Sequence, residues 1–157
     1  DERLDFYPKS NRFGCIKYER WDVMQLNITS DYAIRTVLYL AIHKNECCFA
    51  ADIEQAMAVP AKYLHKITSK LKRAGIIETF RGNGGGHQLC RDPREISLYD
   101  ILSLTEKTME INGCLEEEAY CSRNATDTCP VRKMYQEINE VIKHSLQQTT
   151  IASLLKK

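Results

Sequence analysis

Three cysteines stand close together in the C-terminal third of the chain, and cysteine thiolates are natural ligands for iron and zinc. Cys114, Cys121 and Cys129 are separated by six and seven residues. A loop of that length can bring three thiolates to one iron–sulfur cluster. Short Cys-x-x-Cys pairs, which would favour structural zinc, are absent from the sequence. The spacing therefore favours an iron–sulfur cluster over zinc and leaves redox-active or inert thiols as the alternative.

A second group of residues suited to chemistry is basic. Between Val59 and Arg94 the sequence has eight Lys and Arg residues against two acidic ones, although the net charge of the whole chain is only +1. A concentrated basic segment in a nearly neutral chain is typical of a face that binds nucleic acid. The alternative is a solvated helix face whose lysines only aid solubility.

The basic residues fall on a helix that the pattern predicts over residues 61–74, AKYLHKITSKLKRA. Pro60 suits the first turn of this helix, and Gly75 is the expected stop. Helical spacing places one set inward, namely Tyr63, Leu64, Ile67 and Leu71, and one set outward, namely Lys62, Lys66, Lys70 and Arg73.

The elements around this helix define its setting. A helix is expected from an N-cap at Ser30 to about Lys44, with Asp31 in its first turn, and a short helix over residues 50–58. After Gly75, the stretches IIETFR and GHQLCR flank GNGG and read as a two-stranded hairpin. Helix, turn, helix and hairpin in this order predict a winged helix-turn-helix, in a fold that is mainly α with a small β-hairpin.

In such a motif the second helix enters the major groove of DNA with its N-terminal residues facing the bases. The candidate DNA-binding residues are Lys62, Tyr63, His65 and Lys66 on that helix, and Arg81 and Gly82 at the start of the glycine-rich wing. Tyr63 is equally well explained as a core residue. An arginine on a tight glycine turn suits a narrow minor groove. The glycine run is not a nucleotide loop, because it lacks Gly-Lys-Ser/Thr and precedes a strand.

The C-terminal part contains a helix capped by Ser97, a cysteine-rich and acidic loop over residues 111–129, and a long helix. The long helix carries an apolar stripe at 3–4 spacing, made of Val131, Met134, Tyr135, Ile138, Val141, Ile142 and Leu146. Such a stripe beyond a small winged domain predicts a dimerisation helix, with packing on its own subunit as the alternative. We expect three parts: an N-terminal extension (1–23), the DNA-binding domain (24–94), and the cysteine loop with the dimerisation helix (95–157).

Several classes are disfavoured by what the sequence lacks. No window of 18 apolar residues spans a membrane, and no secretory signal is evident. Seven cysteines, an odd number, fit a reducing cytoplasm better than a disulfide framework. Cys47, Cys48 and Cys90 are expected to be packing thiols. No nucleophile–base pair or paired carboxylate motif predicts an enzyme.

The motifs DYAIRTVLYLA, VPAKYLHKITSKLKRAGII, RGNGGGHQL and REISLYDIL, followed by the three spaced cysteines, together resemble the Rrf2 family of bacterial transcription regulators. The resemblance covers Met24 to about Leu155. It implies a homodimer with one winged helix-turn-helix per subunit, joined by the long helix. It also implies base contacts from Lys62, Tyr63 and Lys66, and a minor-groove contact from Arg81. His87 stands where many members have tyrosine.

The resemblance further implies a cofactor site. Cluster-bearing members carry three cysteines where this chain has Cys114, Cys121 and Cys129. In members of the NsrR type, which this chain resembles most, an aspartate at the position of Asp31 reaches the cluster of the partner subunit. Members of the IscR type use a histidine at the position of Arg132, which this chain lacks. Asp31 is otherwise explained as a helix N-terminal carboxylate, and Glu116, Glu117, Glu118 and Asp127 are weaker rivals as ligand.

Two functions therefore stay open. The first is a repressor whose operator binding is controlled by a 2Fe–2S or 4Fe–4S cluster that senses nitric oxide, redox stress or cluster supply. The second is a cluster-free member of the CymR type, which regulates sulfur or cysteine metabolism and takes its signal from a partner protein. Both bind double-stranded operator DNA.

Overall fold

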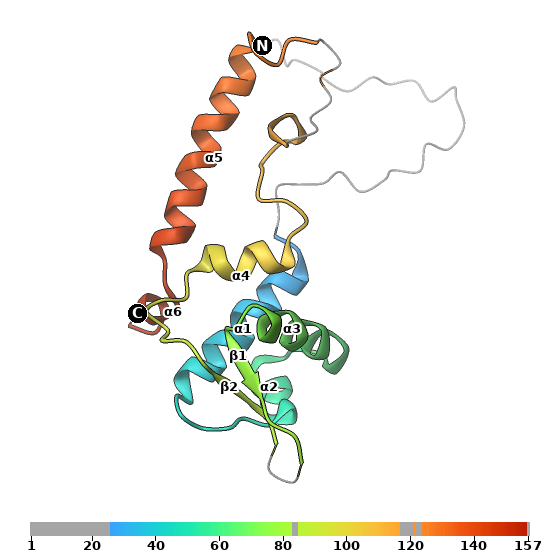
Figure 1. Ribbon diagram of the computed structural model, residues 1–157, viewed down its shortest axis with the longest axis vertical. Coiled ribbons are helices and arrows are strands. Elements are labelled where there is room, and N and C mark those ends of the chain that lie inside the picture. Colours follow the sequence, from blue (N-terminus) through green and yellow to red (C-terminus); the bar gives the residue numbers. More distant parts are fainter. Residues whose placement is uncertain (1–25, 83–84, 117–120, 122–123, 157) are drawn as a thin grey trace, which may run out of the picture.

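The computed structural model describes residues 26–82, 85–116, 121 and 124–156 (Figure 1). The expected extension over residues 1–23 and the wing residues 83–84 lie outside these ranges. In chain order the elements are α1 (Ile28–Ile42), α2 (Ala50–Met57), α3 (Ala61–Arg73), β1 (Ile77–Thr79), β2 (His87–Leu89), α4 (Leu98–Thr105), the 3-10 turn η1 (Gly113–Leu115), α5 (Pro130–Gln148) and α6 (Ile151–Leu154). The mainly helical fold with a small hairpin is therefore confirmed.

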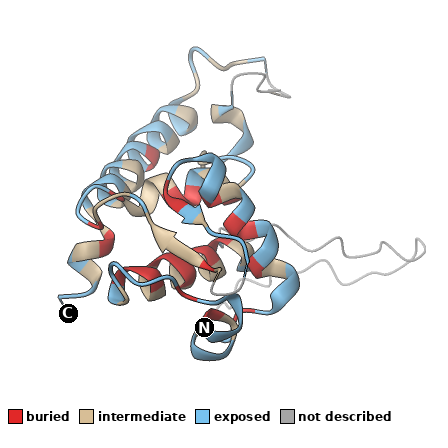
Figure 2. Cartoon of the chain, turned by 60° about the horizontal axis from the view of Figure 1, so that its bottom comes forward, coloured by how far each residue is buried: buried red, intermediate tan, exposed pale blue. Residues whose placement is uncertain are grey.

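The core is shared by α1, α2, α3, α4 and the hairpin. The residues that fill it are fully or almost fully buried, among them Ala33, Val37, Leu40, Ile53, Leu64, Ile67, Leu71, Ile76, Ile77 and Ile101. Helix α5 leaves this body and points away from the end that carries the hairpin (Figure 1). Figure 2 shows the contrast, because buried positions gather on the body and α5 is mostly exposed or half-buried. None of the described helices has the length and apolar character needed to cross a membrane.

Helix α1 begins earlier than its sequence predicts. Asn27, not Ser30, is the N-cap, and its side-chain oxygen accepts a hydrogen bond of 2.6 Å from the amide of Thr29. Ser30 lies inside the helix and is completely buried. Its hydroxyl bonds to Thr105 (2.7 Å) and to Glu106 at the end of α4. The prediction at Ser30 was wrong because a serine hydroxyl serves equally well as a cap and as a buried polar contact between helices.

Helices α2 and α3 form the helix-turn-helix that the sequence predicts. Ala58, in the left-handed region (φ 51°), ends α2, and Gly75 (φ 67°) follows the end of α3. Pro60 is the N-cap residue of α3 rather than part of its first turn, and its carbonyl accepts from the amides of Tyr63 and Leu64. The fixed φ of proline thus starts α3 from the residue immediately before the helix.

The hairpin is antiparallel and pairs Ile77 with Leu89 and Thr79 with His87. It has a third contact that its own sequence does not suggest. Cys48, between α1 and α2, exchanges two backbone hydrogen bonds with His87, of 2.9 and 2.8 Å. The base of the wing is therefore joined to the α1–α2 connection as well as to the end of α3.

The C-terminal end of the chain returns to the body. Ile151, the first residue of α6, is completely buried, and its amide donates to the carbonyl of Ile96 (2.9 Å). A bridge between Ser97 and Thr150 lies beside this contact. Helix α5 is thus anchored to the body at its C-terminal end, while its N-terminal end lies far from the hairpin (Figure 1).

Gly86 provides a test of the wing's attachment. A Cβ atom at this position would lie 2.3 Å from the carbonyl oxygen of Cys48, whereas a Cβ at Gly113 would meet no atom within 4 Å. We expect Gly86→Ala to lower the free energy of unfolding by roughly 1–3 kcal/mol, as overpacking against backbone does. Gly113→Ala, the control, should leave it nearly unchanged. Urea unfolding measures both, and equal midpoints would show that the bridge is not rigid.

Candidate nucleic-acid interface and cysteine loop

Helix α3 separates a buried apolar face from an exposed basic one. Leu64, Ile67 and Leu71 are at most 1% exposed and face the core. Lys62, His65 and Lys66, in its first two turns, are exposed. The N-terminal end of a helix with free donors on its outer face has the form of an element that reads a DNA groove. The predicted orientation of these residues agrees with the structure.

Tyr63 occupies an intermediate position on α3. It is half-buried, and its ring meets that of Tyr32 in α1 edge-on, with 5.2 Å between the centroids. The ammonium group of Lys62 lies 5.2 Å from the centre of the same ring. Packing against α1 is therefore a defined role for Tyr63, in line with the core interpretation that its sequence allows.

Lys70 is not on the exposed face, as predicted, but is half-buried. Its ammonium group donates a hydrogen bond of 2.6 Å to the carbonyl of Leu104, in the last turn of α4. A cation is favourable at this end of a helix, where carbonyls are unpaired and the helix dipole is negative. The helical period alone places Lys70 outward, because it cannot show that α4 packs beside that face.

The described part of the wing keeps its two candidate residues exposed. Arg81 and Gly82 follow β1, and Gly82 has a φ of 96°, which favours glycine. In β2, the ring of His87 lies 3.2 Å from the hydroxyl of Thr79. Burial, followed by the charge of Lys72, lowers the pKa of His87, which favours the neutral imidazole.

Asp31 lies in the first turn of α1 and pairs with Arg35, one turn later, at 2.6 Å. Arg35 also donates to the carbonyl of Met57 (3.3 Å), at the end of α2, and lies over the ring of Tyr32. The candidate ligand is therefore linked through one arginine to the turn before α3. Arg35 is a contact that the sequence motifs do not single out, although its i,i+4 spacing from Asp31 is a recognisable signal.

The cysteine loop, residues 111–129, holds its three thiols on different local structures. Cys114 is in η1, Cys129 is the N-cap residue of α5, and Cys121 lies between them; all three are half-buried. Three thiols of one loop suit an iron–sulfur cluster in donor type. In the part of the chain that the structure describes, however, no three His, Cys, Asp or Glu side chains are close enough to hold a metal ion. Glu117 and Glu118 lie outside that part.

Arg132 connects η1, near the start of the cysteine loop, with the N-terminal end of α5. Its side chain, in the first turn of α5, donates a hydrogen bond of 3.0 Å to the carbonyl of Cys114. Arg132 therefore contacts the backbone of one of the three cysteines of the loop. This contact keeps η1 beside the N-terminal end of α5, where Cys129 lies.

The remaining described cysteines differ from one another. Cys48 is buried, and this burial, together with the charge of Glu46, raises the pKa of its thiol. The packing role predicted for it agrees with the structure. Cys47 and Cys90 are exposed, so the same prediction was wrong for them. The thiol of Cys90 does donate to the carbonyl of Gly75, at 3.1 Å.

Comparisons with known proteins agree with this architecture. Residues 26–157 match the Rrf2 family, described as an iron-dependent transcriptional regulator. Protein aau3 of Rhizobium meliloti (strain 1021) is 32% identical over 134 residues, which cover 85% of this chain and 86% of that protein. The transcriptional regulator NsrR of Geobacillus kaustophilus (strain HTA426) is also 32% identical over 134 residues, covering 84% and 90%. The chain belongs to the Rrf2 family, whose members are regulators of transcription rather than enzymes.

A solved structure shows the same fold. CymR, the global cysteine regulator of B. subtilis, superposes with a TM-score of 0.70 at 24% sequence identity, over 84% of this chain and 96% of that one.

A pair of substitutions can distinguish the stabilising effect of the Lys70 hydrogen bond from the effect of removing a surface charge. We expect Lys70→Met to lower the free energy of unfolding by about 1–2 kcal/mol, because it removes a charged hydrogen bond to a carbonyl in the last turn of α4. Lys66→Met, on the exposed face of the same helix, is the matched control and should be close to neutral. Thermal and urea unfolding measure both. Equal losses for the two variants would contradict the assignment of Lys70.

Proposed function

We propose that the protein is a homodimeric transcription repressor whose binding to operator DNA is controlled by an iron–sulfur cluster on Cys114, Cys121 and Cys129. The observation that carries the DNA-binding part is the first half of α3. It exposes Lys62, His65 and Lys66 on the side opposite its buried leucines and isoleucine. Arg81 and Gly82, which are exposed on the hairpin, extend this surface. The first strand of the hairpin, β1, contacts α3.

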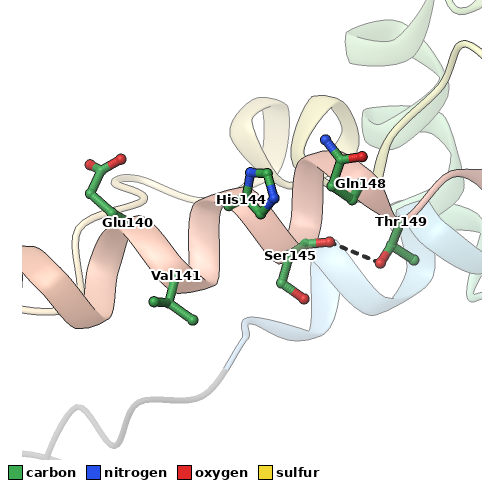
Figure 3. A pocket seen from close by; sticks show the side chains of 6 residues that line it. All are labelled: Glu140, Val141, His144, Ser145, Gln148 and Thr149. Atoms are coloured by element: carbon green, nitrogen blue, oxygen red, sulfur yellow. Dashed lines mark hydrogen bonds between the residues drawn. The ribbon is translucent and has the colours of Figure 1, made fainter.

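The homodimer is supported by α5. Four apolar side chains of its predicted stripe are between 41% and 70% exposed, namely Val131, Met134, Ile138 and Val141. Tyr135, Ile142 and Leu146 are half-buried instead. The stripe continues into a shallow groove at the C-terminal end of α5, which Val141, His144 and Ser145 line in part (Figure 3). An exposed apolar strip along a helix is best explained by a second copy that covers it.

These two surfaces assign different functions to the two parts of the chain in this proposal. Residues 24–94 form the DNA-binding part, and residues 95–157 carry the cysteine loop and the dimerisation helix. Both recognition helices of the dimer then meet adjacent turns of the same DNA duplex. The first residues of the chain, 1–23, have no role in this proposal.

The cofactor is supported by the donor set and by the relatives. The matching family is described as iron-dependent, and NsrR is among the regulators that the chain resembles. A bound cluster would supply iron that reacts with nitric oxide or oxygen, and this reaction makes it a sensor. The chain's own part is to offer three thiolates, with Asp31 of the partner subunit as the proposed fourth ligand.

Arg35 links that ligand to DNA recognition. Asp31 pairs with Arg35, which also donates a hydrogen bond to the carbonyl of Met57. Ligation of Asp31 would remove this partner and change the contacts of Arg35 with the end of α2. Because α2 leads through Ala58 into α3, the state of the cysteine loop would alter how the recognition helix is held.

The second candidate is a cluster-free regulator of the CymR type that responds to a partner protein. It is supported by the likeness of the fold to that of CymR, the global cysteine regulator of B. subtilis. The two candidates share the DNA-binding surface and differ only in what controls it.

The DNA-binding surface is tested with Lys66→Ala and Arg81→Ala. We expect each to weaken binding to duplex DNA that the parent protein has selected from a random pool, and to lower the slope of log affinity against log salt by about 1. Lys133→Ala, an exposed lysine on α5, is the control and should change neither. Fluorescence anisotropy between about 50 and 200 mM salt measures the slope. Parent-like binding by both variants at every salt concentration would refute the proposed surface.

The cofactor is tested by anaerobic reconstitution with ferrous iron and sulfide. The parent should gain visible absorbance with bound iron and sulfide, and its DNA affinity should change. Alanine at Cys114, Cys121 or Cys129 should remove the absorbance, while Cys90→Ala, outside the loop, should keep it. A parent chain that takes up neither iron nor sulfide would decide in favour of the cluster-free regulator.

A further inference from the structure

The one position of α5 that is buried among its described residues is polar. Asn139 is 2% exposed, whereas its apolar neighbours Ile138 and Val141 are 41% and 70% exposed. A buried amide is unfavourable unless its hydrogen bonds are made, so its partners indicate what this face of α5 is for. The partners are in the segment that leads into the cysteine loop.

Both polar atoms of the Asn139 side-chain amide form hydrogen bonds. Its oxygen accepts from the backbone amide of Ile111 (3.0 Å), and its nitrogen donates to Glu110 (2.6 Å). The other carboxylate oxygen of Glu110 accepts from Lys143 (2.7 Å), one turn further along α5. The side chains of Glu110 and Lys143 are only 23% and 22% exposed, so this pair is partly shielded from water. The same hydrogen bond to Glu110 raises the pKa of Lys143.

A second attachment lies three residues further on. Arg132 donates to the carbonyl of Cys114, and Asn112 accepts from the amide of Cys114 (3.1 Å), which starts η1. Residues 110–114 are therefore fixed to α5 at two points, one near its middle and one near its N-terminal end. Cys129 is the N-cap residue of the same helix. Cys114 and Cys129 are thus carried by a single unit, although fourteen residues separate them in the sequence.

We propose that four side chains form a loop clamp, which positions Cys114 relative to Cys129 so that both thiolates can bind the same metal cluster. The loop clamp consists of Glu110, Arg132, Asn139 and Lys143. This inference rests on the proposed function and names positioning residues for its cysteine site. A ligand held by several side chains binds more tightly when those side chains are already ordered, because less conformational entropy is lost on binding. Hydrogen bonds fix both the direction and the register of the loop, which apolar packing does less strictly.

The clamp is tested first on the metal-free chain. We expect Asn139→Ala and, as an independent break, Arg132→Met to increase the alkylation rate of Cys114 by N-ethylmaleimide about fivefold to tenfold, the effect of one to two lost hydrogen bonds. Mass spectrometry reads each cysteine separately, and hydrogen exchange reads the Ile111 amide, which should lose protection in Asn139→Ala. Gln136→Ala, an exposed position on α5, is the matched control. Lys143→Arg, which keeps the ion pair, should behave as the parent. Circular dichroism checks that each variant is folded.

The second step uses ferrous iron and sulfide as the probe under anaerobic conditions. Both breaking variants should bind less iron and sulfide per chain than the Gln136→Ala control. Alkylation and exchange rates equal to those of the control would overturn the clamp. Faster alkylation with unchanged iron uptake would overturn its positioning role. If the parent itself takes up no iron, the cofactor part of the proposed function fails, and alkylation and exchange alone decide whether the clamp exists.

Discussion

The packing of the apolar face of α3 against α1 determines which side of α3 faces water. Leu64, Ile67 and Leu71 are buried together with Val37 and Leu40 of α1. Each such side chain contributes about 1.5–3 kcal/mol when it is fully buried, so rotation of α3 about its axis would be strongly unfavourable. The lysines at its N-terminal end are exposed as a consequence of this constraint. The exposed basic surface is thus set by the core rather than by any contact among the lysines.

Polar contacts, by contrast, connect the elements that surround this core. Several of them meet at the end of α4. Lys70 of α3 reaches the carbonyl of Leu104, while Ser30 and Asn27, at the start of α1, reach Thr105 and Glu106. The chain continues from this point towards the cysteine loop. These directional hydrogen bonds connect the end of α4 to both α1 and α3.

The sequence predicts the elements of this fold well because their signals are local. The apolar period of α3, the glycines of the wing and the stop at Gly75 each depend on a few neighbouring residues. The failures at Ser30 and Lys70 have a common cause. Both side chains can serve two purposes, and α4, which decides between them, is distant in the sequence. Asn139 was missed for the same reason, since nothing near it in the chain shows that Glu110 and Ile111 lie against it.

The bridge between Cys48 and His87 has a consequence for how relatives of this chain can diverge. The connection between α1 and α2 acts as a short third strand at the base of the wing, and Gly86 leaves no room between them. An insertion or deletion between His43 and Cys48 would therefore change the tilt of the hairpin against α3 without replacing any side chain on the exposed face. The length of this connection would therefore influence the position of the wing independently of the side chains exposed on α3.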